Sequence, residues 1–195
     1  MEKNSIIVGV VALIIGIGIG YVFWGSTPTQ SGSHMMQNGE MMSQNIDQHF
    51  IAQMIPHHEG AIEMAKIALT RSKRPEVLTL AQGIIEAQEK EITDMRSWYQ
   101  SWFGSAPPEG GMGMMHMDGM EGDITRLESV SDVALELEFL TQMIPHHEMA
   151  LMMAQMLEAS TERSEMKTLA DNIQTSQSRE IDMMRGWLKT WADGQ

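Results

Sequence analysis

The block QMIPHHEGAIEMA occupies residues 53–65, and a near copy of it, QMIPHHEMALMMA, occupies residues 142–154. Shifting the chain by 89 positions aligns residues 50–102 with residues 139–191 without a gap, and 24 of the 53 aligned positions are identical. A solenoid needs at least three repeats to bury a continuous core. Two copies of this length therefore predict one fold with pseudo-two-fold symmetry.

Each copy has the pattern of two helices joined by a short turn. Apolar residues recur at i, i+3 and i+4 spacing, and Pro75 marks a helix start because the residue before a proline avoids the helical region. The expected helices cover about residues 47–70, 75–102, 131–159 and 164–191. Two such hairpins, without any strand pattern, predict an all-α four-helix bundle.

The helical hairpins divide the chain into five segments. These are a transmembrane anchor or signal at 1–25, a flexible Met-containing tether at 26–45, a first hairpin at 46–104, a Met-rich crossover linker at 105–128 and a second hairpin at 129–193. The linker is long enough to run the length of a bundle.

The N-terminal segment predicts a membrane anchor. Residues 6–24 form an uncharged run of 19 residues, long enough for one transmembrane helix, and the run ends in aromatic residues that suit a membrane interface. A secretory signal has a shorter apolar stretch and a small-residue cleavage site, so an uncleaved anchor is favoured over a cleaved signal. Lys3 precedes the run and no Lys or Arg follows before Lys66, which places the N-terminus in the cytoplasm and the rest outside a bacterial inner membrane.

Composition excludes several classes of function. The chain has no Cys, which excludes disulfides, zinc fingers, iron–sulfur clusters and thiol catalysis. It carries 26 acidic and 13 basic residues, and this excess of negative charge argues against a nucleic-acid-binding surface. The 21 Met residues are either an unusual core filler or a supply of soft sulfur ligands.

The repeated block has the spacing of a metal site. Met54, His57 and His58 fall at i, i+3 and i+4, so they share one helix face with buried alanines. The second copy repeats this pattern at Met143, His146 and His147. One buried His is usually a hydrogen-bonded core residue and a Met on such a face is usually filler, but burying four imidazoles together is costly without a further role. The pattern therefore favours metal ligands.

Polar residues on the second helix of each hairpin suggest support for these imidazoles. Gln88 and Gln177, with Glu91 and Glu180, lie on the inner face of the predicted helices. They could orient the histidines as hydrogen-bond acceptors. For the two glutamates, an exposed position serves equally well as an explanation.

The donor types point to a soft metal. Di-iron bundles use Glu-x-x-His, which occurs nowhere in this chain, and Met-x-x-His stands in its place twice. Exchanging a carboxylate for a thioether shifts the preference from iron towards Cu(I), with Ag(I) as a mimic, and disfavours zinc.

The linker carries a second group of soft donors between glycines. A flexible segment has no core to fill, so core filling does not explain these methionines. A soft-metal site is favoured, and a hydrophobic surface that docks partner proteins is the alternative interpretation. Its predicted ligands are Met112, Met114, Met115, His116, Met117 and Met120.

The doubled QMIPHHE block, the Met-rich linker and the exported helical context resemble the CopM-like family, formerly a domain of unknown function, over about residues 46–191. The resemblance implies a ferritin-like bundle in the periplasm or at the membrane that binds copper in resistance or metallochaperone roles. It implies metal ligands at Met54, His57, His58, Met143, His146 and His147, and further sulfur donors at Met64, Met95, Met153 and Met184.

The leading hypothesis is a non-enzymatic protein that captures Cu(I) and buffers it or hands it to a copper exporter or another periplasmic copper protein. Two alternatives stay open. One is a metal-dependent oxidoreductase such as a cuprous oxidase, in which Glu91 and Glu180 would be the proton relay. The other is a metal-free helical interaction module that uses exposed methionines.

Overall fold

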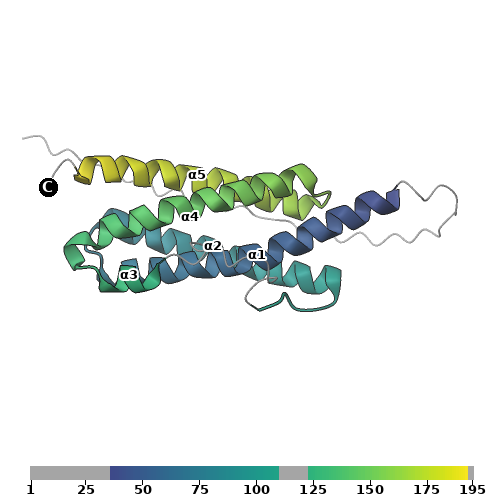
Figure 1. Ribbon diagram of the computed structural model, residues 1–195, viewed down its shortest axis with the longest axis horizontal. Helices are drawn as coiled ribbons and strands as arrows, with labels where there is room; N and C mark the ends of the chain where they lie inside the picture. Colours follow the sequence, from purple (N-terminus) through teal and green to yellow (C-terminus); the bar gives the residue numbers. More distant parts are fainter. Residues whose placement is uncertain (1–35, 110–122, 193–195) are drawn as a thin grey trace, which may run out of the picture. The chain divides into compact units, whose positions relative to one another are not determined.

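The structure is a computed structural model that describes residues 36–109 and 123–192. Four long helices and one short helix make up most of this part of the chain (Figure 1). Their bounds are α1 Met36–Arg71, α2 Pro75–Phe103, α3 Ile124–Ser129, α4 Asp132–Ser160 and α5 Ser164–Ala192. No strand occurs in these ranges, so the all-α prediction is confirmed.

The observed helix bounds differ from the predicted ones in two places. Helix α1 begins at Met36 rather than near residue 47, so the end of the predicted flexible tether is helical. Met, Gln and Glu fill much of this stretch and have good helix propensity, which the prediction of a tether underrated. The second difference is α3, which occupies the end of the predicted linker.

The helices pack as two antiparallel hairpins, α1 with α2 and α4 with α5, which meet along α1 and α4. Figure 1 shows the α4/α5 pair lying against the α1/α2 pair. Arg71 at the end of α1 pairs with Asp132 at the start of α4, and Asp47 in the first half of α1 pairs with Arg163 just after α4. Helices α1 and α4 are therefore antiparallel too, and the predicted four-helix bundle is confirmed.

Large aliphatic and aromatic side chains fill the bundle. The fully buried ones include Ile51, Ile84, Leu135, Phe139, Leu140 and Leu157. Burying each of them stabilises the fold by about 1.5–3 kcal/mol. Beside the histidines the core is lined by alanines instead, at Ala61, Ala65, Ala150 and Ala154. These small residues let α1 and α4 approach closely enough for larger polar side chains to meet between them.

Matching cation–π contacts join the two hairpins at the ends of α2 and α5. The Arg74 guanidinium lies 4.1 Å from a Trp191 ring centroid, and the repeat-related Arg163 lies 4.2 Å from that of Trp102. Each of these Trp rings also stacks on a second Trp one turn earlier in its helix. The pseudo-two-fold symmetry expected from the 89-residue repeat therefore extends to contacts between the hairpins.

Arg71 fastens α3 and the start of α4 to the end of α1. Its guanidinium donates hydrogen bonds of 2.5–3.2 Å to the carbonyls of Leu127, Glu128 and Val130 and to the carboxylate of Asp132. Helix α2 ends beside the first half of α1, where Gln48 donates to the Tyr99 hydroxyl. The described residues on either side of the connection between α2 and α3, Phe103 and Ile124, therefore lie towards opposite ends of the bundle.

Replacing Arg71 with Ala is expected to lower the free energy of unfolding by about 2 kcal/mol, since several charge-assisted hydrogen bonds are lost at once. Urea unfolding measures the loss, and hydrogen exchange should accelerate in α3. The matched control is Arg179→Ala, because Arg179 donates to the Thr175 carbonyl of its own exposed helix face. A control variant that loses as much stability as Arg71→Ala would contradict the assignment.

The predicted N-terminal anchor, residues 6–24, lies outside the described residues. Within the described ranges, no helix combines the length and the apolar character that crossing a bilayer requires.

Candidate metal site

Two histidines from different hairpins meet at the centre of the bundle. The ring centroids of His57 on α1 and His146 on α4 lie 3.7 Å apart, with the ring planes at 40°. The two positions are related by the repeat, so the pair lies on the pseudo-two-fold axis. His58 and His147 follow them in sequence, and all four imidazoles are at most 2% exposed. The expected burial of four imidazoles together is therefore observed.

The environment of His57 disfavours its protonation. Burial holds the pKa of His57 well below its ordinary value, and a positive charge there would also be repelled by charge on His146, His58 and His147. Neither ring nitrogen of His57 makes a hydrogen bond to another described side chain. His57 is therefore a neutral imidazole at neutral pH, which is the form that binds metals.

The outer histidine of each copy is held by a carboxylate. His58 Nε2 lies 2.7 Å from Glu91 Oε2, and His147 Nε2 lies 2.7 Å from Glu180 Oε2. An ionised carboxylate accepts, so Nε2 carries a proton in each pair, and in the neutral form of the imidazole Nδ1 then keeps its lone pair. Both Nδ1 atoms are buried without a hydrogen-bond partner among the described residues. A fixed tautomer with a free ring nitrogen is the usual preparation of a metal-binding histidine.

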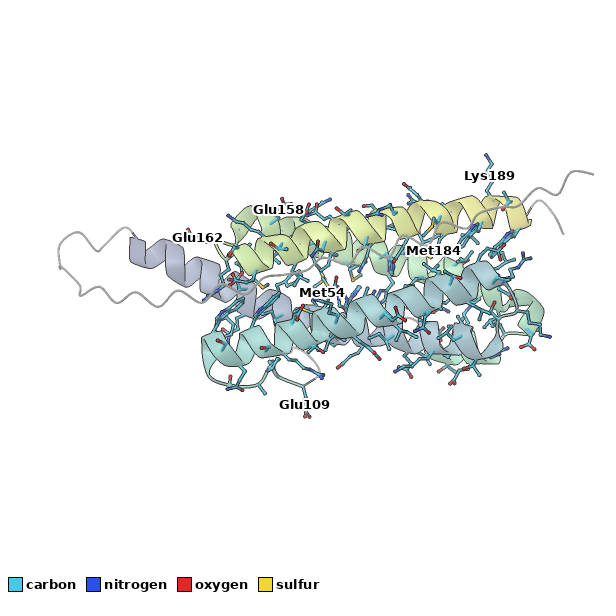
Figure 2. All side chains as sticks on the ribbon, turned by 180° about the vertical axis from the view of Figure 1, so that it is seen from behind. Met54, Glu109, Glu158, Glu162, Met184 and Lys189 are labelled. Atoms are coloured by element: carbon cyan, nitrogen blue, oxygen red, sulfur yellow. The ribbon has the colours of Figure 1, made fainter. Side chains whose placement is uncertain are left out.

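Methionines of both hairpins are buried in the same core as the histidines. Met54, Met64, Met95, Met143 and Met184 are fully buried, and Met153 is half-buried against the core. Figure 2 shows Met54 and Met184 between the helices of the bundle. Met54 lies one turn before His58 on α1, and Met95 lies one turn after Glu91 on α2. Because α1 and α2 are antiparallel, both methionines lie on the same side of the His58–Glu91 pair along the bundle axis. Met143 and Met184 have the same relation to His147 in the second hairpin.

These donors are sulfur and neutral nitrogen, which suit a soft cation. In the described parts of the chain, no three or more His, Asp or Glu side chains are arranged to hold a metal among themselves. The thioethers of Met54, Met95, Met143 and Met184 are buried in the same core and add sulfur donors to the imidazoles.

The glutamates that end each HHE block do not join the imidazoles. Glu59 pairs with Arg96 of α2 at 2.6 Å, and Glu148 pairs with Arg185 of α5. These side chains are about half exposed, so each pair contributes on the order of 0.5 kcal/mol. The block therefore provides two His to the core and one Glu to the surface between paired helices.

The remaining predicted residues divide in two groups. Gln88 and Gln177 are buried, and their Oε1 atoms have no hydrogen-bond partner among the described residues. The predicted linker ligands, Met112, Met114, Met115, His116, Met117 and Met120, lie outside the described residues.

Sequence reasoning missed a buried acidic position that both copies share. Asp47 is fully buried and pairs with Arg163 at 3.2 Å, while burial raises the pKa of its carboxyl against the opposing effects of Thr161 and Arg163. Its repeat-related residue, Glu136, is also buried and accepts a 3.0 Å hydrogen bond from Ser72 Oγ. Extending the 89-residue alignment by three positions would have shown two acids at one site.

Comparison with known proteins places this arrangement in a family. Residues 47–188 match the family described as "Domain of unknown function (DUF305)". The chain belongs to this family. An uncharacterized protein, L153, of Acanthamoeba polyphaga mimivirus is 43% identical over 51 residues, which are 26% of this chain and 34% of that protein.

Solved structures of this DUF305 protein's relatives share its fold and much of its sequence. CopM in the Cu(II)-bound form is 46% identical with a TM-score of 0.69, covering 74% of this chain and 97% of CopM. CopM in the Cu(I)-bound form is 44% identical with a TM-score of 0.66 and coverages of 74% and 96%. A DUF305 protein described as secreted, from Streptomyces coelicolor, is 28% identical with a TM-score of 0.67, covering 74% of this chain and 91% of the other. The predicted membership of a CopM-like family is confirmed.

Proposed function

We propose that this protein binds copper outside the cytoplasm, taking up Cu(I) through methionine and histidine side chains and buffering it or handing it on without catalysing a reaction. The single observation that carries the proposal is the contact between His57 and His146 on the pseudo-two-fold axis. Burial takes both imidazoles out of water, and that cost is hard to explain by the stability of the bundle alone.

Three further observations support copper as the cargo. His58 and His147 each keep a buried Nδ1 lone pair while a glutamate holds Nε2. Thioethers lie one turn from both. CopM, which shares the fold and almost half of the sequence, has been solved with Cu(I), Cu(II) and silver. Of these ions, Cu(I) best matches neutral sulfur and imidazole donors.

The proposed core ligands are those predicted by the repeat: Met54, His57, His58, Met95, Met143, His146, His147 and Met184, with Met64 and Met153 as further sulfur donors. The linker methionines and His116 are proposed as a separate soft-metal site. The proposed location is the outer side of a bacterial inner membrane, which rests on the uncharged run at residues 6–24. The proposed receiver of the ion is a copper exporter or another copper protein in the same compartment.

A binding role is favoured over an oxidase role because Glu91 and Glu180, the two candidate proton carriers, already bond to histidines. A carboxylate that fixes a ligand's tautomer is poorly placed to relay protons as well. Oxygen consumption after addition of Cu(I) would favour the oxidase instead.

The test is a titration of the full chain with Cu(I) against a competing chromogenic chelator. The wild type is expected to withdraw Cu(I), and a variant with His57, His58, His146 and His147 all changed to Ala is expected to lose the core share of binding. The matched control is His49→Ala, since His49 lies on α1 but is exposed. Retention of all binding by the four-histidine variant would move the site to the methionine-rich linker, and no binding by the wild type would refute the proposal.

A further inference from the structure

Four methionines follow one another along α4 directly after the histidine pair. Met149, Met152, Met153 and Met156 fall at i, i+3, i+4 and i+7, so they share one face of the helix. Met152 is 58% exposed and Met156 is 65% exposed, while Met149 and Met153 are half-buried. Exposed side chains of this size gain no burial free energy, so core filling does not explain them.

The same face leads from solvent to the histidine centre. His146 precedes Met149 by three residues, so its imidazole lies one turn away on adjoining parts of the helix surface. Met156 and Met152 are more than half exposed, Met149 and Met153 are half-buried, and His146 is 2% exposed, so this side of α4 includes exposed, half-buried and buried positions. Soft donors are thus available at each turn between the surface and the core.

The first hairpin shows that the fold does not require these methionines. The positions related to Met149, Met152, Met153 and Met156 by the repeat are Gly60, Glu63, Met64 and Ile67. Three of the four therefore carry no sulfur, although the surrounding helices have the same arrangement.

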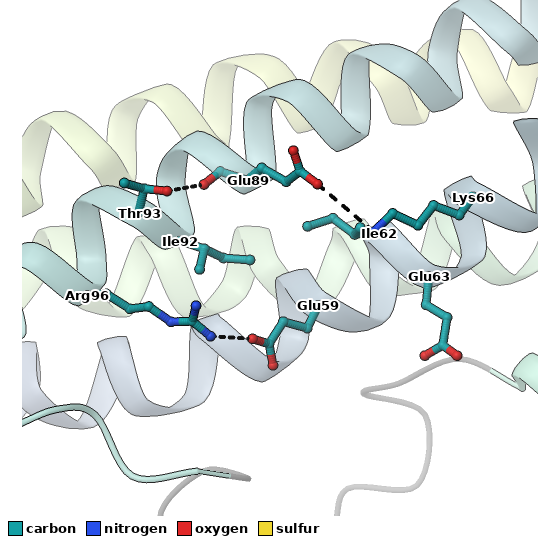
Figure 3. Close-up of a pocket in the computed structure, with 8 residues that line it drawn as sticks. All are labelled: Glu59, Ile62, Glu63, Lys66, Glu89, Ile92, Thr93 and Arg96. Atoms are coloured by element: carbon teal, nitrogen blue, oxygen red, sulfur yellow. Dashed lines mark hydrogen bonds and ion pairs between the residues drawn. The ribbon is translucent and has the colours of Figure 1, made fainter.

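The counterpart of Met152 has a different role in the first hairpin. Glu63 lines a surface groove of about 570 Å³ between α1 and α2, among the charged side chains of Glu59, Lys66, Glu89 and Arg96 (Figure 3). Lys66 and Glu89 approach to 4.0 Å there. At this repeat-related position, Glu63 lines a charged, solvated groove in the first hairpin, whereas Met152 exposes a thioether in the second. Methionine at residue 152 is a property of the second hairpin alone.

We infer that Met149, Met152 and Met156 form, with Met153 at the edge of the core, a second, solvent-accessible site for a soft monovalent cation, which takes up Cu(I) and passes it to the histidine core. Met153 is the donor that the two sites share. The inference rests on the proposed function, because it names the route by which the same cargo reaches the core. Side chains three and four residues apart have Cβ atoms about 5–6 Å apart, and the flexible methionine chain lets two or three sulfurs close on one ion. Thioethers are uncharged ligands, so a solvent-exposed methionine site binds such a cation weakly enough to release it readily.

The test uses the full chain labelled with ¹³C at the methionine methyl groups, titrated with Ag(I). Resonances of Met152 and Met156 are assigned from their Leu variants. We expect Ag(I) to shift both resonances, and the double variant M152L/M156L to bind one Ag(I) fewer per chain and to load Cu(I) from a chelator several-fold more slowly. Leucine keeps the volume and removes the sulfur, so folding is preserved.

The matched control is Met183→Leu, because Met183 is 44% exposed on α5 and lies outside the series. It should leave stoichiometry and loading rate unchanged. The variant with all four core histidines replaced separates the two proposals, because it should still shift Met152 and Met156 with Ag(I). Unmoved Met152 and Met156 resonances in a wild type that still binds metal would overturn this inference alone, whereas no metal binding anywhere would overturn the proposed function as well.

Discussion

Lowering the pH below about 6.5 is expected to reduce the free energy of unfolding of the metal-free protein by up to about 1.4 kcal/mol per pH unit for each histidine whose pKa is lowered by burial. His57 is such a residue. In the unfolded chain it takes up a proton near pH 6.5, whereas the folded core resists that proton. Between the two pKa values the unfolded state binds more protons, so stability is full above about pH 6.5 and falls as the pH falls towards the folded pKa.

Urea unfolding at several pH values between 7.5 and 5 measures this slope. The chain's net charge of −13 would have the opposite effect, since partial neutralisation of 26 acidic residues relieves repulsion as the pH falls. The substitution His57→Met replaces the titrating imidazole with an apolar side chain, so the stability of this variant should depend less steeply on pH. The exposed His49→Ala serves as the control and should keep the wild-type slope. Equal slopes in wild type and His57→Met would show that the buried pair does not govern acid stability.

The repeat made much of the site predictable from sequence alone. Spacing placed Met54, His57 and His58 on one face, and symmetry required the second copy to present the same face to the same interior. Pro75 fixed the start of α2, where structure and prediction coincide. Periodicity could not decide the role of Glu91, because a residue at the border of core and surface fits either. The structure shows its carboxylate 2.7 Å from His58 with a side chain 15% exposed.

Other features depend on tertiary geometry that no periodic pattern contains. The guanidinium of Arg71 donates hydrogen bonds to the backbone carbonyl oxygens of Leu127, Glu128 and Val130. Every residue type has a backbone carbonyl, so the sequence does not mark these acceptors. The repeat gave no signal either, since Ser160 takes the place of Arg71 in the second copy. The exposure of Met152 and Met156 was likewise not predictable, because sequence spacing shows that residues share a face but not how far that face is covered.

Saturating the protein with Ag(I) or Cu(I) is expected to raise its melting temperature by about 10 °C. A ligand at 1,000 times its dissociation constant stabilises the native state by about 4 kcal/mol, and each kcal/mol corresponds to about 2–4 °C in a domain of this size. Replacing both Met54 and Met143 with Leu should reduce the shift by about 3–6 °C for each tenfold loss of affinity. Differential scanning calorimetry with and without the ion measures both values.

The Leu substitutions separate the two explanations of buried methionine. A Met-to-Leu exchange conserves volume and usually costs less than about 1.5 kcal/mol, so a core filler tolerates it in both states. A ligand loses its sulfur, and the loss appears only in the metal-bound melting temperature. Met166→Leu is the matched control, because Met166 is fully buried at the start of α5 and has no proposed part in metal binding. An undiminished shift in the Met54/Met143 variant would identify these residues as filler.

The shift in melting temperature also distinguishes metal binding in the core from metal binding by other methionines of the chain. A ligand stabilises the native state only by the difference between its binding to the folded and to the unfolded chain. Methionines that hold an ion equally well in both states therefore contribute to the stoichiometry and not to the shift. His57 and His146 come from different hairpins and lie 3.7 Å apart only in the folded bundle. If they and the methionines around them are the ligands, the shift depends on residues 89 positions apart, and replacing those of one hairpin alone should remove most of it.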